Sequence, residues 1–157
     1  MGQESQAVYQ VKIVVDTNII FSGLLNTNGT IGELLFNSKG VFDFYSCSYM
    51  HYEIEKHWAK LQRISKLSDS QLTEAWFKLH EKIHFINEEL IPEKTWIASE
   101  KIVTNIDIDN IDFIALTKYL KGYLWTGDKG LYIGLKKKRF TRVFNTTELA
   151  ELRKTKQ

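Results

Sequence analysis

The stretch Val11-Lys12-Ile13-Val14-Val15-Asp16-Thr17-Asn18 sets the fold class. Four of its first five residues are apolar and β-branched, which is typical of a strand buried on both faces of a parallel sheet. The run ends in three polar residues, Asp16, Thr17 and Asn18. Ligand sites of open parallel sheets lie beyond the carboxyl ends of their strands. Asp16 is therefore the first candidate functional residue.

Three further strands are predicted at Phe42–Cys47, Tyr123–Thr126 and Arg142–Phe144. Helical patterns separate the strands, which implies an α/β fold of three layers, with a mainly parallel central sheet flanked by helices. Capping pairs predict the starts of three helices, at Thr30 with Glu33, at Ser68 with Gln71 and at Asn145 with Glu148. The helix that begins at Ser68 is expected to end at about Ile83. Four more helices are predicted from Ser48 through Glu53 to about Ile64, over Glu93–Asn105, from Asp109 or Asn110 to Gly122, and over Leu131–Lys138.

The 157 residues are enough for one domain with a buried core. We expect a flexible N-terminus over 1–10, a single domain over 11–150 and a basic C-terminal tail over 151–157. No run approaches the ~18 apolar residues of a membrane helix, and Met1–Gln6 lacks the pattern of a signal peptide. Cys47 is the only cysteine, which favours a reducing compartment. The expected location is cytoplasmic, with no membrane partner.

Charge is distributed unevenly, although the net charge is only +2. Up to Asp128 there are 12 Lys and Arg against 17 Asp and Glu, and from Lys129 onward there are 9 against 2. This asymmetry predicts an acidic site beside a basic rim that could hold phosphates, with Lys129, Lys136 and Lys137 as candidates. The structural alternative is a helix with a solvated basic face.

Carboxylates from distant parts of the sequence should meet at the strand ends. Asp16 closes the first strand and Asp128 follows the third, while Glu53 lies in the helix after the second; Asp109 and Asp112 begin the helix before the third. Clustered acids repel, so a divalent cation is their natural neutraliser. All-oxygen ligation suits Mg²⁺ or Mn²⁺. Each acid taken alone is more often a helix cap than a ligand.

The chain resembles the PIN-domain nucleases, specifically the branch of toxins of toxin–antitoxin systems. The resemblance spans Val11 to about Leu149 and is carried by Val14-Val15-Asp16-Thr17-Asn18, by Glu53-Ile54, and by Phe113-Ile114-Ala115-Leu116 with Leu124-Trp125-Thr126-Gly127-Asp128-Lys129. It implies a PIN-like fold, a metal-dependent ribonuclease, RNA as partner, a cognate antitoxin and frequent homodimers. Carried over by position, it makes Asp16, Glu53 and Asp128 the catalytic, metal-holding acids. Thr17, Asn18 and Thr126 are then their hydrogen-bonding supports.

One position departs from the family pattern. Many relatives have a catalytic Asp three residues before the Phe that opens the apolar face of the fifth helix, and here that residue is Asn110. An amide offers an oxygen to a metal but no negative charge. Asp109 or Asp112 could replace it, and the helical geometry favours Asp109. Two hypotheses follow: a metal-dependent endoribonuclease, and a degenerate PIN module that binds RNA or a protein without cutting.

Other motifs are weaker. His80 and His84 have the i,i+4 spacing of a zinc pair, but no third ligand follows, so surface histidines are favoured. Cys47 has no indicated His partner for a nucleophile's role. Trp125 lies near Asp128 and could stack on a base, although buried packing is the preferred interpretation.

Overall fold

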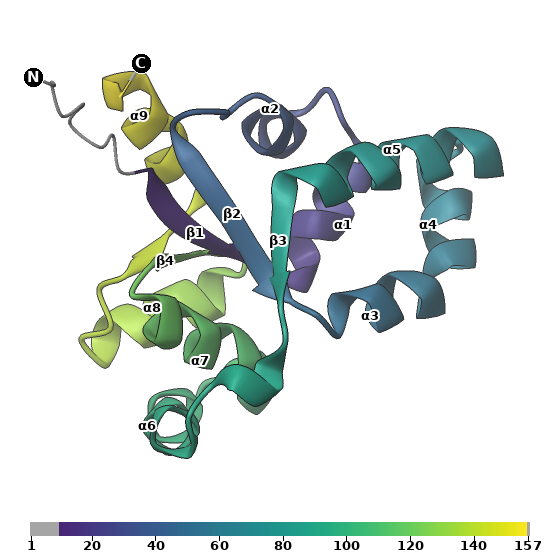
Figure 1. Cartoon of the computed structure of the whole chain (residues 1–157). Coiled ribbons are helices and arrows are strands. Elements are labelled where there is room, and N and C mark those ends of the chain that lie inside the picture. The colour runs from purple at the N-terminus through teal and green to yellow at the C-terminus, as the bar shows by residue number, and fades with distance from the viewer. Residues whose placement is uncertain (1–9, 157) are drawn as a thin grey trace, which may run out of the picture.

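The structure is a computed structural model that describes residues 10–156, drawn in Figure 1. Apart from Gln10, the expected flexible N-terminus over 1–10 lies outside the described residues. Five strands form one sheet in the order β3-β2-β1-β4-β5, and all four neighbouring pairs are parallel. The strands are β1 Val11–Val15, β2 Phe42–Cys47, β3 Ile83–Ile86, β4 Tyr123–Trp125 and β5 Val143–Phe144.

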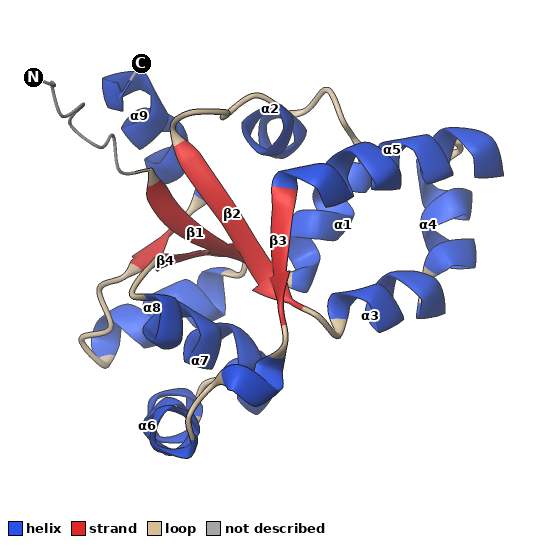
Figure 2. Cartoon of the chain, viewed as in Figure 1, coloured by secondary structure: helices blue, strands red, loops and turns tan. Residues whose placement is uncertain are grey.

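Helices cover both faces of this sheet, so the α/β three-layer prediction is confirmed. Figure 2 shows α6 and α7 stacked on one side of the strands and α1 with α5 on the other. The helices are α1 Thr17–Leu25, α2 Thr30–Phe36, α3 Met50–Lys56, α4 Trp58–Ser65, α5 Asp69–Lys82, α6 Glu93–Val103, α7 Ile111–Leu120, α8 Lys129–Lys137 and α9 Thr146–Lys156, with short 3₁₀ turns η1 Glu88–Leu90 and η2 Ile108–Asn110.

The central strand β1 is the best buried element of the core. Ile13, Val14 and Val15 have no exposed surface, because β2 and β4 flank the strand and helices cover its faces. Each strand of the parallel sheet points the same way, so the residues after Val15 and after Trp125 emerge at one edge. This edge carries the candidate site.

Two aspartates end strands and begin helices at the same time. The Asp16 side chain accepts a hydrogen bond from the Ile19 amide at 3.0 Å, and that of Asp128 accepts one from the Leu131 amide at 3.0 Å. Each satisfies a backbone donor that the first helical turn leaves unpaired. The strand-to-helix turns of α1 and α8 therefore fix where these two carboxylates lie.

The structure corrects several predicted boundaries. Helix α1 and strand β3 were not predicted from the sequence. The single helix expected from Ser48 to Ile64 is wrong, because it breaks at His57 into α3 and α4. Gly29, not Thr30, occupies the N-cap position of α2, with no side-chain cap hydrogen bond. The paired caps predicted at Ser68 with Gln71 and at Asn145 with Glu148 are both confirmed.

The basic tail expected over 151–157 continues α9, which ends at Lys156. Its Arg153 pairs with Glu33 of α2, which ties the last helix to the body of the domain. Within residues 10–156, none of the helices has the length and apolar character needed to cross a membrane.

Candidate metal centre

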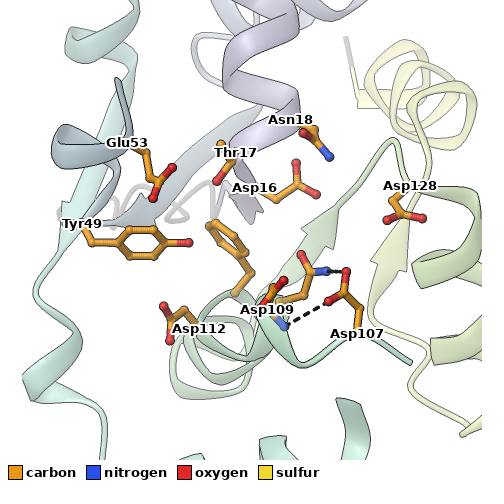
Figure 3. A pocket seen from close by; sticks show the side chains of 11 residues that line it. Asp16, Thr17, Asn18, Tyr49, Glu53, Asp107, Asp109, Asp112 and Asp128 are labelled. Carbon is orange, nitrogen blue, oxygen red and sulfur yellow. Dashed lines mark hydrogen bonds between the residues drawn. The ribbon is translucent and has the colours of Figure 1, made fainter. Parts of the chain in front are cut away.

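An acidic cavity of about 460 Å³ lies at the carboxyl edge of the sheet. Its walls come from the start of α1, from α3, from η2 with the first turn of α7, and from the turn into α8. Figure 3 shows side chains from these elements arranged around a common space. The cavity is lined by Asp16, Thr17, Asn18, Tyr49, Glu53, Asp107, Asp109, Asn110, Asp112, Phe113 and Asp128.

Asp16 is the most buried acid of this cavity, with only 3% of its surface exposed. Burial, which disfavours the charged form, raises the pKa of Asp16 to about 6. Hydrogen bonds from Ile19 and Thr126 act in the opposite sense, and the nearby charge of Asp128 raises the pKa further. A carboxylate with this environment gains stability from a cation placed beside it.

Thr126 joins the two strand-end acids. Its hydroxyl donates to Asp16 Oδ2 at 2.9 Å and accepts from the Asp128 amide at 3.1 Å. The threonine is itself buried, so both contacts are held in a fixed arrangement. Thr126 therefore lies behind the two acids and orients Asp16, and it does not line the acidic cavity itself. Thr17 and Asn18 line the cavity directly.

Glu53, Tyr49 and Asp112 form the far wall of the cavity, on the left of Figure 3. Glu53 lies 3.4 Å from His57 Nε2, one helical turn along. Burial and the charge of Glu88 raise the pKa of Asp112 above its ordinary value. Burial and the charge of Asp112 also raise the pKa of the Tyr49 hydroxyl. This wall therefore adds two more carboxyl groups, those of Glu53 and Asp112, to the acidic cavity.

The structure gives Asn110 a definite partner. Its side-chain amide donates to Asp107 Oδ2 at 2.9 Å, while Asp107 Oδ1 accepts from the Asp109 amide at 3.0 Å. Asn110 is also the N-cap residue of α7 but makes no side-chain cap hydrogen bond there. Both proposed substitutes, Asp109 and Asp112, line the cavity. The departure from the family pattern therefore leaves the cavity with acids on either side of the amide.

Asp107 and Tyr49 belong to this cavity and were missed by sequence reasoning. The signal for Asp107 was available, because Asp-x-Asp is a pattern in which the first side chain caps a short turn. Its second oxygen is what holds Asn110. No comparable sequence signal identified Tyr49, since a tyrosine before a helix is common.

The donor set fits a hard divalent cation. Every side chain that could ligate in the cavity offers oxygen, and no Lys, Arg or His contributes to its lining. Carboxylate, amide and hydroxyl oxygens are the ligands that Mg²⁺ and Mn²⁺ prefer. Across residues 10–156, however, no three His, Cys, Asp or Glu side chains already converge as a ready-made metal site. The acids surround the cavity instead of meeting at one point.

The predicted phosphate-binding lysines lie outside the acidic cavity. Lys129 lines a neighbouring cavity of about 410 Å³, which shares Asp128 with the first. Lys137 lines a third one, together with Asp107 and Asp128. The Lys136 ammonium lies 5.3 Å above the ring of Tyr132, where it makes a cation–π contact. Positive charge therefore lies on the α8 side of Asp128.

Comparison with known sequences finds a family match. A family model described as a PIN domain matches residues 14–152, a range that contains every residue of the acidic cavity. No match to a curated protein was found.

Proposed function

The chain belongs to the PIN-domain family, whose members are generally nucleases, and we propose that it is a Mg²⁺- or Mn²⁺-dependent endoribonuclease. One observation carries the proposal: Asp16, almost fully buried at the end of β1, has a raised pKa beside Asp128 in a cavity lined by oxygen donors. A buried carboxylate with a strongly shifted pKa in a cleft is a recognised mark of a functional site.

The residues of the cavity have distinct roles in this proposal. Asp16, Glu53 and Asp128 would hold the ion, with Asp109, Asn110 or Asp112 completing the ligand set. Thr126 keeps Asp16 in one orientation through the hydrogen bond to Oδ2. When bound, a divalent ion lowers the pKa of a water molecule and stabilises charge on the phosphodiester oxygens. Thr17 and Asn18 are placed to hydrogen-bond a phosphate or an attacking water.

RNA as substrate rests on the family resemblance. The basic groups on the α8 side, Lys129 and Lys137, are proposed to hold phosphates on either side of the scissile bond without reading sequence. The acidic cavity and these lysines both border Asp128. A strand crossing the cavity at Asp128 would therefore pass from the acids to the lysines.

The test is cleavage of a circular RNA and its linear form in Mg²⁺, in Mn²⁺ and in EDTA. We expect metal-dependent cutting of both substrates, and loss of at least about a hundredfold in rate with Asp16→Asn. Asparagine keeps the oxygen that caps α1, so folding is preserved. The control is Glu151→Gln, which removes an equal charge from the exposed face of α9. Cutting that persists in EDTA or in Asp16→Asn would overturn the proposal.

The second candidate is a PIN module that binds RNA or a protein without cutting, and Asn110 favours it. Its amide is engaged by Asp107, and it brings no charge to a position where many relatives have an acid. Asn110→Asp distinguishes the two. If the wild type is inactive and Asn110→Asp cuts in Mn²⁺, the chain is a disabled nuclease. If the wild type already cuts, the amide is tolerated and the nuclease proposal stands.

A finer role, the toxin of a toxin–antitoxin pair in the cytoplasm, is proposed from the family resemblance alone. Its partners would be a small antitoxin encoded beside it and a second copy of this chain. Expression of the chain should arrest growth, and co-expression of the adjacent small reading frame should relieve the arrest. A neighbourhood without such a reading frame would contradict this role while leaving the ribonuclease proposal intact.

A further inference from the structure

Two histidines from different helices meet outside the acidic cavity. The zinc-like spacing of His80 and His84 does not place them on one helical face, because α5 ends at Lys82 and His84 lies in β3. There His84 packs against Tyr45, with ring centroids 5.0 Å apart. His80 instead faces His51 of α3, and their Nε2 atoms are 2.8 Å apart. Both side chains are exposed.

The hydrogen bonds define which nitrogens carry lone pairs. His51 Nδ1 lies 2.9 Å from the Ser48 carbonyl oxygen, which can only accept, so Nδ1 carries the proton. In the neutral ring Nε2 of His51 then carries the lone pair and accepts a hydrogen bond from His80 Nε2, so binding of an ion between them requires His80 to move that proton to its Nδ1. A histidine that donates one N–H to a backbone carbonyl while its other nitrogen carries a lone pair has the arrangement of a metal ligand.

Aromatic packing holds the two imidazoles in place. Phe85 of β3 stacks on His80 at 4.9 Å and lies 4.5 Å from His51. Trp76 of α5 meets both rings edge-on, at 5.4 and 6.2 Å. Because each ring is packed against the same two aromatic side chains, little rotamer freedom remains to be lost when a ligand binds.

We propose that His51 and His80 form a two-imidazole site for Cu²⁺ or Ni²⁺. Metal–imidazole bonds of about 2.0–2.1 Å place two nitrogens roughly 2.9 Å apart at a right angle, and roughly 3.3 Å apart at the tetrahedral angle. The observed separation of 2.8 Å matches the right angle. Square-planar and tetragonal nitrogen sites are those of Cu²⁺ and Ni²⁺, whereas structural zinc is tetrahedral.

The site differs in place and chemistry from the acidic cavity. Neither His51 nor His80 belongs to the cavity lining, and its ligands are nitrogens where the cavity offers oxygens. Among residues 10–156, no third His, Cys, Asp or Glu completes a cluster with them. The remaining positions on the ion are left to water or to a donor from another molecule. A bound ion would bridge α3, which carries Glu53, to α5.

The test is titration of the untagged full chain with NiCl₂ or CuCl₂ while excess Mg²⁺ is present for the acidic cavity. Trp76 lies beside both imidazoles, so binding of either paramagnetic ion should quench its fluorescence and saturate at one equivalent. His51→Ala and His80→Ala should each weaken binding at least about tenfold. The matched control, His84→Ala, removes another exposed histidine, which packs against Tyr45, and should leave metal binding unchanged. Trp76→Phe should remove the quenching but not the binding.

Pulsed electron paramagnetic resonance of the Cu²⁺ complex counts the bound imidazoles directly. We expect two in the wild type and in His84→Ala, and one in either single variant. The proposal is overturned if His51→Ala and His80→Ala bind as tightly as the wild type, if His84→Ala loses binding equally, or if Zn²⁺ displaces Ni²⁺ at equal concentration. None of these measurements involves RNA cleavage, so they stand apart from the nuclease proposal.

Discussion

Asp16 caps α1 through Ile19 and also lines the acidic cavity, so one carboxylate serves both folding and the proposed chemistry. The cap needs only an acceptor oxygen, which an asparagine also provides. A substitution can therefore remove the negative charge of Asp16 and still keep the cap of α1. The burial of this charge is what raises the pKa of the side chain.

This separation predicts a pH-dependent gain in stability for Asp16→Asn in EDTA. The pKa of Asp16 is about 6 in the folded protein, against an ordinary value of 3.8, so the folded state holds the proton more tightly. The wild type therefore loses free energy of unfolding as pH rises between about 4 and 6, by roughly 3 kcal/mol in all. Asp16→Asn has no carboxyl group at this position, so its free energy of unfolding does not fall in this way. Urea unfolding should therefore give Asp16→Asn a higher free energy of unfolding than the wild type at pH 7.5 but not at pH 4.

Mg²⁺ provides the matching control for this prediction. An ion bound by Asp16 stabilises the wild-type folded state and should shrink the advantage of the variant at pH 7.5. An advantage of equal size at both pH values, or one that Mg²⁺ leaves unchanged, would contradict the assignment of the charge to an ion-binding role.

Cys47 should be chemically inert in the folded protein. It has no exposed surface, and its thiol lies 3.7 Å from the Asp112 carbonyl oxygen. Burial, with the charges of Asp112 and Glu88, raises the pKa of the thiol well above its ordinary range, so the reactive thiolate is suppressed. Iodoacetamide should label Cys47 only in denaturant, and Cys47→Ala should retain RNA cleavage. Rapid labelling of the native chain would contradict the structure at this point.

At the scale of elements, the strands that the sequence predicted are those with apolar β-branched runs and polar ends, such as Val11–Val15. Helix α1 was missed because Ile19, Ile20 and Leu24 are all buried, which leaves no polar face and no amphipathic period to detect. Strand β3 was missed for a different reason. It follows α5 with no intervening turn, so Ile83 continued the apolar period of the helix.

The candidate site was predictable as far as strand ends determine it. The parallel sheet predicts that Asp16 and Asp128 lie at the same edge, since both residues come after strands that point to that edge. Glu53 and Asp112 were candidates from their positions in helices next to the strands, but they reach the cavity only through the packing of α3 and α7, which strand ends do not determine. The Asn110–Asp107 hydrogen bond depends on the backbone of η2, which no spacing rule specifies.

The junction between α7 and β4 gives a prediction for one glycine. A Cβ on Gly122 would lie 2.7 Å from the Lys12 carbonyl oxygen, which belongs to the backbone of β1 and cannot move away cheaply. Gly122→Ala should therefore cost about 1–3 kcal/mol of the free energy of unfolding. Gly127→Ala is the control, because a Cβ there meets only Ile19 at 3.9 Å. Equal denaturation midpoints for the two variants would argue against this close approach.

On the scale of the whole molecule, three of the nine cations from Lys129 onward are engaged in contacts that hold the fold together. Lys138 donates to the carbonyls of Lys101 and Thr104, which ties the end of α8 to α6. Arg142 donates to the carbonyls of Lys121 and Gly122. Arg153 pairs with Glu33. The positive charge of this segment therefore overstates the charge that is available to a nucleic acid.

Two cations beside Asp128 predict how RNA binding depends on salt. Lys129 and Lys137 border the cavities beside Asp128, so each should neutralise one phosphate of a bound strand. For single strands the logarithm of affinity falls with the logarithm of salt concentration by about 0.7 per phosphate contacted. The double variant Lys129→Gln with Lys137→Gln should thus lower the slope by roughly 1.4 in EDTA, where no cutting occurs.

The matched control is Lys154→Gln, since Lys154 is exposed on α9 and pairs with Glu151 at 3.6 Å, away from Asp128. Fluorescence anisotropy of a labelled RNA over a range of KCl concentrations gives both slopes. If binding followed the total charge of the segment, each charge removed would change the slope equally. A change for the pair beside Asp128 that is more than twice the change for Lys154→Gln would instead mean that the strand crosses the edge of the sheet where β1 and β4 end, because phosphate contacts depend on position as well as on charge.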